Sequence, residues 1–134
     1  MTTDPAGLTE RFRGTLGELL GIRFVETSLD CVVAELPVRD ALKTVGGAVH
    51  GGTLMALADT VGAAATVLNL PPGATTTTLE SKTNFLAAGR ADMIRAESTC
   101  LHRGRRTMVW QTRVTEPGGR LLSITIQTQM VLTG

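Results

Sequence analysis

The 134-residue sequence predicts an α+β fold in which an antiparallel sheet wraps around one long central helix. Residues 51–68 are rich in good helix formers and form too long a run for an ordinary strand. This segment is apolar almost all the way round, which is typical of a helix surrounded by protein. Strand patterns lie on both sides of it. Because the apolar face of a sheet needs a cover and the helix needs burial, we expect the sheet to curl around the helix.

The chain before the central helix has the pattern of one helix and two strands. Residues 8–20 carry apolar side chains at helical spacing, and Gly21 follows as a common helix end. Strands are expected at residues 22–27 and 31–38, with a short turn between them. Residues 39–49 are irregular and lead into the central helix. The apolar residues at helical spacing are Leu8, Phe12, Leu16, Leu19 and Leu20.

The chain after the central helix has strand character throughout. The sequence Pro71-Pro72-Gly73 ends the helix, and strands are expected at 75–86, 93–101, 107–116 and 122–132. The third of these alternates Met108, Trp110, Thr112 and Val114 with Thr107, Val109, Gln111 and Arg113. In the last strand Leu122, Ile124, Ile126, Met130 and Leu132 share one face, and Ser123, Thr125, Gln127 and Gln129 share the other. Such alternation predicts that one face is buried and the other meets water or a partner.

Composition excludes several classes of protein. A chain of this length predicts a single domain over residues 1–134, with 1–20 as an N-terminal helical segment. A net charge of +1 and the absence of Tyr argue against binding to nucleic acid. The apolar helix is interrupted by Asp59, so we expect no membrane span. Cys31 and Cys100 have no CxxC spacing, and the N-terminus lacks a signal-peptide pattern, so we expect a cytoplasmic protein.

The central helix carries the candidate active site. Asp59 is the one charged residue between Gly51 and Leu79, and a carboxylate in such surroundings is costly unless it is hydrogen-bonded, paired or used. The pair Gly51-Gly52 follows His50 where the helix begins, and helix N-termini present free N–H donors and partial positive charge. An acid two turns downstream of such donors indicates an active site.

Four motifs together resemble the hotdog-fold acyl-CoA thioesterases, most closely the PaaI-type branch named for phenylacetate catabolism. They are His50-Gly51-Gly52, Leu57-Ala58-Asp59, Asn84-Phe85-Leu86 and Arg103-Gly104-Arg105-Arg106-Thr107. The similarity runs from about Gly21 to Leu132 with the elements in the same order. The resemblance implies a sheet around the central helix, a homodimer whose two sheets join, and often a tetramer made of two dimers. It also implies hydrolysis of an acyl-CoA thioester without metal or prosthetic group.

The resemblance assigns roles to individual residues. Asp59 matches the catalytic carboxylate, and Gly51 matches the glycine whose N–H polarises the thioester carbonyl. Thr78 matches a Ser/Thr that places the attacking water when the alignment is anchored on Asn84-Phe85-Leu86, whereas counting forward from Asp59 gives Thr77. The family usually carries Asn or Gln six residues before the motif histidine, and this chain has Thr44 there. The remaining substrate-binding candidates are His50, Gly52, Asn84, Arg103, Arg105 and Arg106.

This chemistry agrees with the residues themselves. A backbone donor at the position of a developing oxyanion is typically worth about 2.7–4 kcal/mol, and general-base catalysis contributes roughly 10²–10⁴-fold. Arg is suited to gripping the phosphates of coenzyme A. Small residues beside the acid (Gly62 and Ala63) and after the third strand (Ala87 and Ala88) are expected to leave space for an acyl group.

Other interpretations stay open at this stage. Asp59 could cap nearby backbone, His50 could orient the loop before the helix, and the arginines could form a solvated turn. The same scaffold could bind acyl-CoA without catalysis, although a pure binder gains nothing from a buried acid. A hydratase is expected to carry Asp and His five residues apart, and Ala64 occupies the fifth position after Asp59.

The spacing of the two main candidates has a further consequence. At 1.5 Å per residue, Asp59 lies about 12 Å along the helix from Gly51, which is too far for both to reach one thioester carbonyl. In the family that the chain resembles, the donor and the acid at one site come from different chains. A two-fold dimer with antiparallel central helices would bring them together twice.

Overall fold

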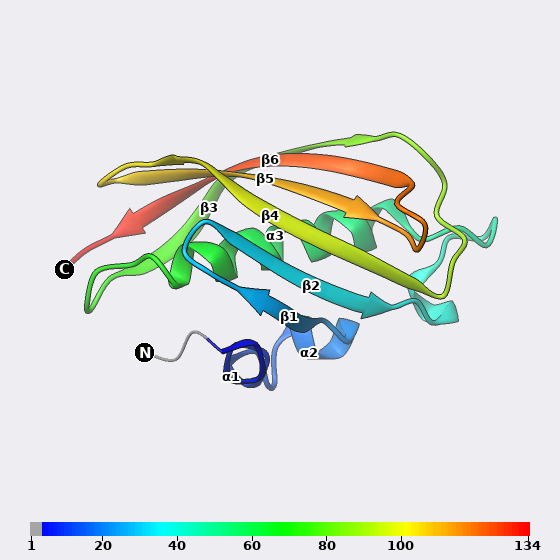
Figure 1. The fold of residues 1–134 in the computed structure, drawn as a ribbon, viewed down its shortest axis with the longest axis horizontal. Coiled ribbons are helices and arrows are strands. Elements are labelled where there is room, and N and C mark those ends of the chain that lie inside the picture. Colours follow the sequence, from blue (N-terminus) through cyan, green and yellow to red (C-terminus); the bar gives the residue numbers. More distant parts are fainter. Residues whose placement is uncertain (1–3) are drawn as a thin grey trace.

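The computed structural model describes residues 4–134. Residues 1–3 lie outside the described part, so the predicted N-terminal segment is tested from Asp4 on. The elements in chain order (Figure 1) are α1 (Pro5–Arg11), α2 (Leu16–Leu20), β1 (Arg23–Thr27), β2 (Cys31–Pro37), a short 3₁₀ helix (Asp40–Leu42), α3 (Gly51–Val67), β3 (Thr75–Phe85), β4 (Met93–Arg103), β5 (Thr107–Thr115) and β6 (Leu121–Leu132).

The six strands form one sheet in the order β1-β2-β4-β5-β6-β3, and every neighbouring pair is antiparallel. The helix α3 packs against β2, β3, β4, β5 and β6, so one face of the sheet covers it (Figure 1). The predicted sheet around a central helix is therefore confirmed. The strands β1 and β3 are the two edges, and β3 has β6 as its one neighbour in the described sheet.

The central helix is buried on most of its circumference but not on all of it. Leu57, Val61 and Ala64 are fully buried against the sheet. A stripe at helical spacing is only partly covered, and Met55 at 40% exposure is its most open member. The stripe comprises Met55, Ala56, Asp59, Thr60, Ala63 and Val67. The sequence predicted a helix surrounded by protein, and along this stripe the helix's own chain leaves it partly uncovered.

The N-terminal segment forms two short helices instead of the single helix predicted over 8–20. The first ends at Phe12, and Gly14 takes a positive φ of 79° before the second begins. Leu8 and Leu20 are buried, but Leu16 and Leu19 are 57% and 68% exposed. The break turns Leu16 and Leu19 away from the core, so the helical spacing predicted across it does not hold for them. Gly21 ends α2 in the left-handed conformation, as predicted.

The neighbouring strands β5 and β6 bury the same face of the sheet but fill it with different kinds of side chain. In β5 the predicted alternation is present, and the set of Met108, Trp110, Thr112 and Val114 is the buried one. In β6 the polar set of Ser123, Thr125, Gln127 and Gln129 is fully buried, and Leu122, which the sequence placed on the other face, is fully buried as well. Ile126 and Leu132 are 41% and 40% exposed. Register explains the arrangement, because Gln127 lies opposite Trp110 and both face α3.

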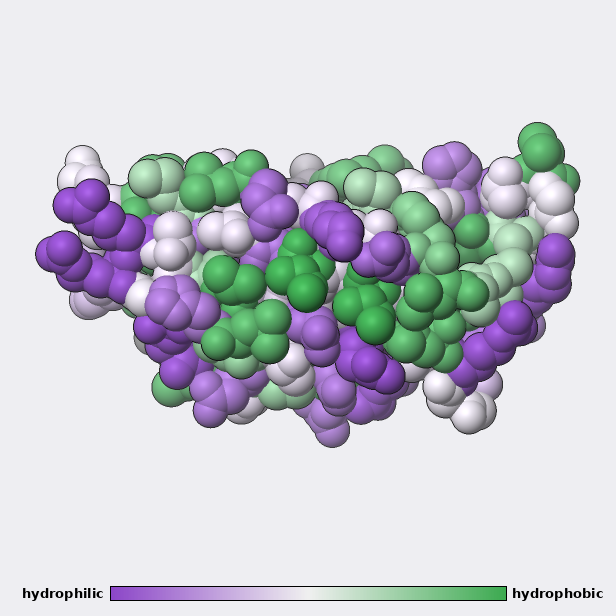
Figure 2. Space-filling model, turned by 90° about the horizontal axis from the view of Figure 1, so that it is seen from above, coloured by the Kyte–Doolittle hydropathy of each residue, from purple (hydrophilic) through white to green (hydrophobic). Residues whose placement is uncertain are grey.

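The outward apolar residues of β6 contribute to an unevenly apolar surface. Seen from above, from the side on which β6 lies in Figure 1, groups of apolar side chains alternate with hydrophilic ones (Figure 2). Among residues 4–134, no helix is both long enough and apolar enough to cross a membrane.

Candidate active site

The Asp59 carboxylate is held by two side chains from two neighbouring strands. Its Oδ1 accepts a hydrogen bond from Thr78 Oγ1 of β3 at 2.7 Å and another from Gln127 Nε2 of β6 at 3.0 Å. Thr78 and Asp59 are half-buried, whereas Thr77 is exposed and lies opposite Met130 on the outer face of the sheet. The structure therefore brings Thr78 to Asp59, and the alternative Thr77 faces away.

The hydrogen bonds continue from Thr78 into β6 and back to β3. Gln129 Nε2 donates to Thr78 Oγ1 at 2.6 Å, and Thr76 Oγ1 donates to Gln129 Oε1 at 3.0 Å. Both glutamines are fully buried. Sequence reasoning placed them on the polar face of β6 and did not connect them with Asp59. One sequence signal could have connected them with Asp59: the two glutamines occupy alternate positions of one strand, so both point to the same face of the sheet.

Gln127 fills the space that the sequence suggested for an acyl group. A Cβ at Gly62 would lie 2.2 Å from Gln127 Oε1 and 2.4 Å from its Cδ. Gly62 is buried, one turn after Asp59 on α3. The missing side chain at Gly62 therefore makes room for the glutamine, and the expectation that it leaves a substrate cavity is wrong.

The start of α3 leaves one backbone donor without a protein acceptor. His50 is the N-cap residue, and its Nδ1 accepts a hydrogen bond from Gly52 N at 2.7 Å. This contact supports the structural interpretation of His50. Within the described part of the chain, no acceptor is bonded to the Gly51 N–H. A free donor at a helix N-terminus suits a developing negative charge.

An open pocket of about 410 Å³ lies beside Gly51. The ring of Phe85 lies against the glycine, because a Cβ at Gly51 would be 3.2 Å from Phe85 Cε1. Ala87 and Ala88 line the pocket as the sequence suggested, while Gly62 and Ala63 do not. Its full lining is Ala48, Val49, Gly51, Leu54, Phe85, Leu86, Ala87 and Ala88. The pocket is therefore apolar apart from its backbone groups.

Two further candidates lie away from Asp59. Thr44 is exposed in a turn, where its backbone N–H donates to Ala48 O and its carbonyl accepts from Gly47 N. Asn84 is exposed near the end of β3 and lies opposite Ile124 on the outer face of the sheet. The structure does not bring either side chain to Asp59.

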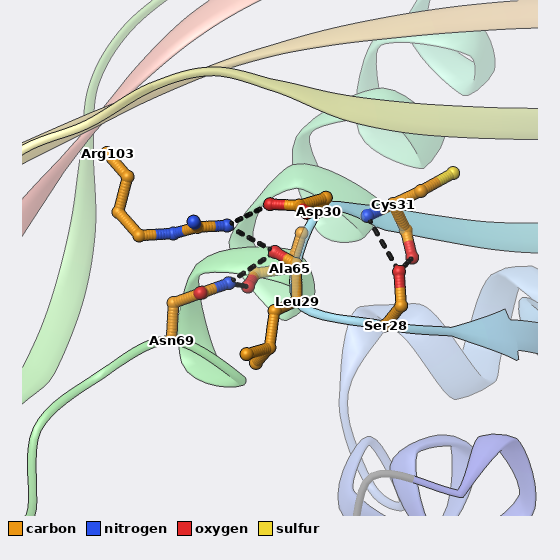
Figure 3. A network of polar contacts seen from close by, with 7 residues as sticks. All are labelled: Ser28, Leu29, Asp30, Cys31, Ala65, Asn69 and Arg103. Carbon is orange, nitrogen blue, oxygen red and sulfur yellow. Dashed lines mark hydrogen bonds and ion pairs between the residues drawn. The ribbon is translucent and has the colours of Figure 1, made fainter.

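The arginines of the β4–β5 turn fall into two groups. Arg103 Nη2 donates to Asp30 Oδ1 at 2.6 Å and to Leu29 O at 2.7 Å, and Asn69 Nδ2 donates to the same carbonyl (Figure 3). The hydrogen bond with Asp30 raises the pKa of the Arg103 guanidinium above its ordinary value. Arg103 therefore ties the β1–β2 turn to β4, whereas Arg105 and Arg106 are exposed on the turn itself.

Comparison with known proteins places this geometry in a family. The family model described as "Thioesterase superfamily" matches residues 46–123, which include both Gly51 and Asp59. The chain belongs to this superfamily. It is therefore a thioester hydrolase, and the predicted hotdog fold is confirmed.

Individual relatives agree with that assignment. The chain is 32% identical to a 1,4-dihydroxy-2-naphthoyl-CoA hydrolase of Escherichia coli over 108 residues, covering 81% of this chain and 79% of the relative. The thioesterase HI1161 of Haemophilus influenzae has a similar structure, with a TM-score of 0.94, 28% identity, and coverage of 99% of this chain and 93% of that one. A variant of the thioesterase PA1618 of Pseudomonas aeruginosa gives a TM-score of 0.93 at 29% identity, with coverage of 98% and 96%.

The close packing of Gln127 on Gly62 predicts an unusual response of this thioesterase to alanine. In an open helix, Gly→Ala gains about 1 kcal/mol, but Gly62→Ala forces the side chain into Gln127 and should lower the free energy of unfolding by about 1–3 kcal/mol. Denaturant unfolding at one fixed protein concentration measures the change. Gly46→Ala is the control, because a Cβ there meets nothing within 4 Å. Equal stability of Gly62→Ala and the unchanged protein would contradict the packing described.

Proposed function

We propose that the protein is an acyl-CoA thioesterase of the PaaI type, in which Asp59 activates a water molecule and the Gly51 N–H stabilises the oxyanion. The observation that carries this proposal is the Asp59 carboxylate, held through Oδ1 by Thr78 and Gln127 on a helix whose first residue keeps a free donor. If Asp59 had only a structural role, nothing in that role would require a free backbone donor at the start of the same helix.

The proposed reaction needs no group other than water. Asp59 takes a proton from the water as its oxygen forms a bond to the acyl carbon. The carbonyl oxygen becomes an oxyanion that accepts from the Gly51 N–H. The carbon–sulfur bond then breaks, the sulfur leaves as the thiolate of coenzyme A, and the proton held by Asp59 passes to it. The products are the free acid and coenzyme A.

We propose further that each site is shared between two chains. Along α3 the rise of 1.5 Å per residue puts about 12 Å between Gly51 and Asp59, so one carbonyl cannot meet both from the same chain. The partly exposed stripe of α3 includes Asp59, and β3 is an edge strand of the described sheet. Antiparallel packing of two α3 helices, with the two β3 edges adjoining, would place the acid of one chain beside the donor of the other.

The apolar pocket beside Gly51 supports an apolar acyl group as the substrate. Its volume of about 410 Å³ suits an aromatic ring system or a medium-length chain. The similarity to a hydrolase named for 1,4-dihydroxy-2-naphthoyl-CoA favours testing aromatic acyl groups first. Arg105 and Arg106, which are exposed, are the proposed contacts for the phosphates of coenzyme A, since Arg103 is engaged by Asp30.

Several broader features stay predictions. The outward-facing Ile126 and Leu132 support a tetramer in which two dimers pack through their sheets. A single domain over residues 1–134 and a cytoplasmic location are proposed as the sequence suggested. We also propose that no cofactor takes part.

The direct test of the function is removal of the carboxylate charge. Asp59→Asn keeps an oxygen that can accept from Thr78 and Gln127, so the fold should survive, but it removes the base. We expect kcat to fall at least about a hundredfold with KM little changed. Thiol release is measured on a panel of acetyl-, hexanoyl-, benzoyl- and palmitoyl-CoA. Asp92→Asn, at an exposed aspartate, is the matched control; near-normal turnover of Asp59→Asn would refute the assignment.

The shared site predicts complementation between two inactive chains. Gly51→Pro removes the donor N–H at the first position of a helix, where proline is tolerated. When equal amounts of Asp59→Asn and Gly51→Pro are unfolded and refolded together, half the dimers should be mixed and each should hold one intact site. About a quarter of the original activity should therefore return.

A second variant controls for crowding at Phe85. Gly51→Ala keeps the donor and adds a Cβ against the same ring, so it should retain much more activity than Gly51→Pro. No recovery in the mixture, with mixed dimers confirmed by mass and each variant shown to fold and dimerise, would mean that each site is built within one chain.

A further inference from the structure

We infer that Gln127 and Gln129 are positioning residues that orient Asp59 and the Thr78 hydroxyl for catalysis. This inference rests on the proposed function of Asp59. Neither glutamine is expected to touch the substrate, because both are fully buried between the sheet and α3. They act through Asp59 and Thr78, which are only half-buried.

Gln127 binds the carboxylate directly. Its Nε2 lies 3.0 Å from Asp59 Oδ1 and 3.5 Å from the Asp59 carbonyl oxygen. Its Oε1 is buried, and no residue in the described range 4–134 donates to it. Burying an amide with one unsatisfied oxygen is costly, and an apolar side chain of the same length would fill the space beside Gly62 without that cost. The contact with the carboxylate is what the amide adds at this position.

Gln129 acts on the carboxylate through Thr78. Its Nε2 donates to Thr78 Oγ1 at 2.6 Å, and its Oε1 accepts from Thr76 Oγ1 at 3.0 Å. The Thr76 hydroxyl also lies 2.8 Å from the carbonyl oxygen of Met130. Because a hydroxyl has one proton to give, a Thr78 oxygen that accepts from Gln129 keeps its proton for Asp59. Gln129 therefore sets the direction of the Thr78 hydrogen bond.

The two glutamines together make the two oxygens of Asp59 unequal. Oδ1 accepts from both Thr78 and Gln127, whereas no donor in the described chain is bonded to Oδ2. Hydrogen bonds to a charged acceptor are the stronger class, and two of them to one oxygen restrict rotation of the carboxylate. The free oxygen, Oδ2, is then the one that takes the proton from water.

The experiment compares kcat and KM of single and double variants on the best substrate of the acyl-CoA panel. Gln127→Met keeps the length of the side chain and removes the donor. We expect kcat to fall about tenfold to a hundredfold, as for loss of a hydrogen bond to a charged group, with KM changed less than about twofold. Gln127→Leu replaces it if the Met variant does not fold.

A double-mutant cycle separates positioning from packing at Gln129. Gln129→Met and Thr78→Val should each lower kcat, and combining them should cost no more than about twofold beyond Thr78→Val alone, because Gln129 acts through that hydroxyl. Losses that multiply in the double variant would show that Gln129 acts by packing and would overturn its positioning role.

The matched control removes a side-chain hydrogen bond of β6 that does not involve Asp59 or Thr78. Thr83 Oγ1 and Thr125 Oγ1 are 2.7 Å apart, and neither is bonded to Asp59. Thr125→Val should lower the melting temperature as much as the Gln127 variant does, or more, and leave kcat unchanged. If Gln127→Met retains full kcat while Asp59→Asn is inactive, the inference fails and the proposed function stands. If Asp59→Asn itself is active, the proposed function fails.

Discussion

The requirement to satisfy one carboxylate inside an otherwise uncharged helix governs the structure of this thioesterase. Asp59 is the single charged residue of α3, and its Oδ1 obtains its two donors from β3 and β6. Supplying those donors puts Thr78 and Gln127 on the inner face of the sheet, where apolar residues would otherwise pack. Gln127 in turn needs the space left by Gly62. The acid, the glycine and the polar inner face of β6 are therefore parts of one arrangement.

In the proposed mechanism, the start of the same helix supplies the complementary half of the chemistry. His50 caps Gly52, and among residues 4–134 no acceptor is bonded to the Gly51 N–H, which lies beside a pocket lined by apolar side chains. An oxyanion donor and a base on one straight helix, about 12 Å apart, cannot act together on one carbonyl. Burial supports the same conclusion, because Asp59 lies on the partly exposed stripe of α3, where a second chain can reach it. Geometry and exposure thus both support a site completed by dimerisation.

The sequence predicted the fold well because its strongest signals are local. A long apolar run without strand character, and clear alternation in β5, needed no knowledge of tertiary contacts. The face of β6 was predicted less well, because alternation shows that two faces differ but not which one meets α3. That choice depends on the hydrogen bond between Asp59 and Gln127, which lie 68 positions apart. Gln129 and Thr78 are likewise 51 positions apart, and these separations concealed the connection of both glutamines with the site. Similarly, the ion pair between Arg103 and Asp30 joins two turns that adjoin only in the folded sheet, so a motif of basic residues could not separate Arg103 from Arg105 and Arg106.

The central claim is that Asp59 activates water and does not itself attack the thioester. A single turnover in H₂¹⁸O, with enzyme in excess over acyl-CoA, tests this claim most directly. Mass spectrometry would follow the free acid and the peptide that contains Asp59. Direct attack by water predicts ¹⁸O in the acid released in the first turnover and none in Asp59. Unlabelled acid together with ¹⁸O in the Asp59 carboxylate would contradict the account, because it would show that the carboxylate forms a covalent anhydride with the acyl group.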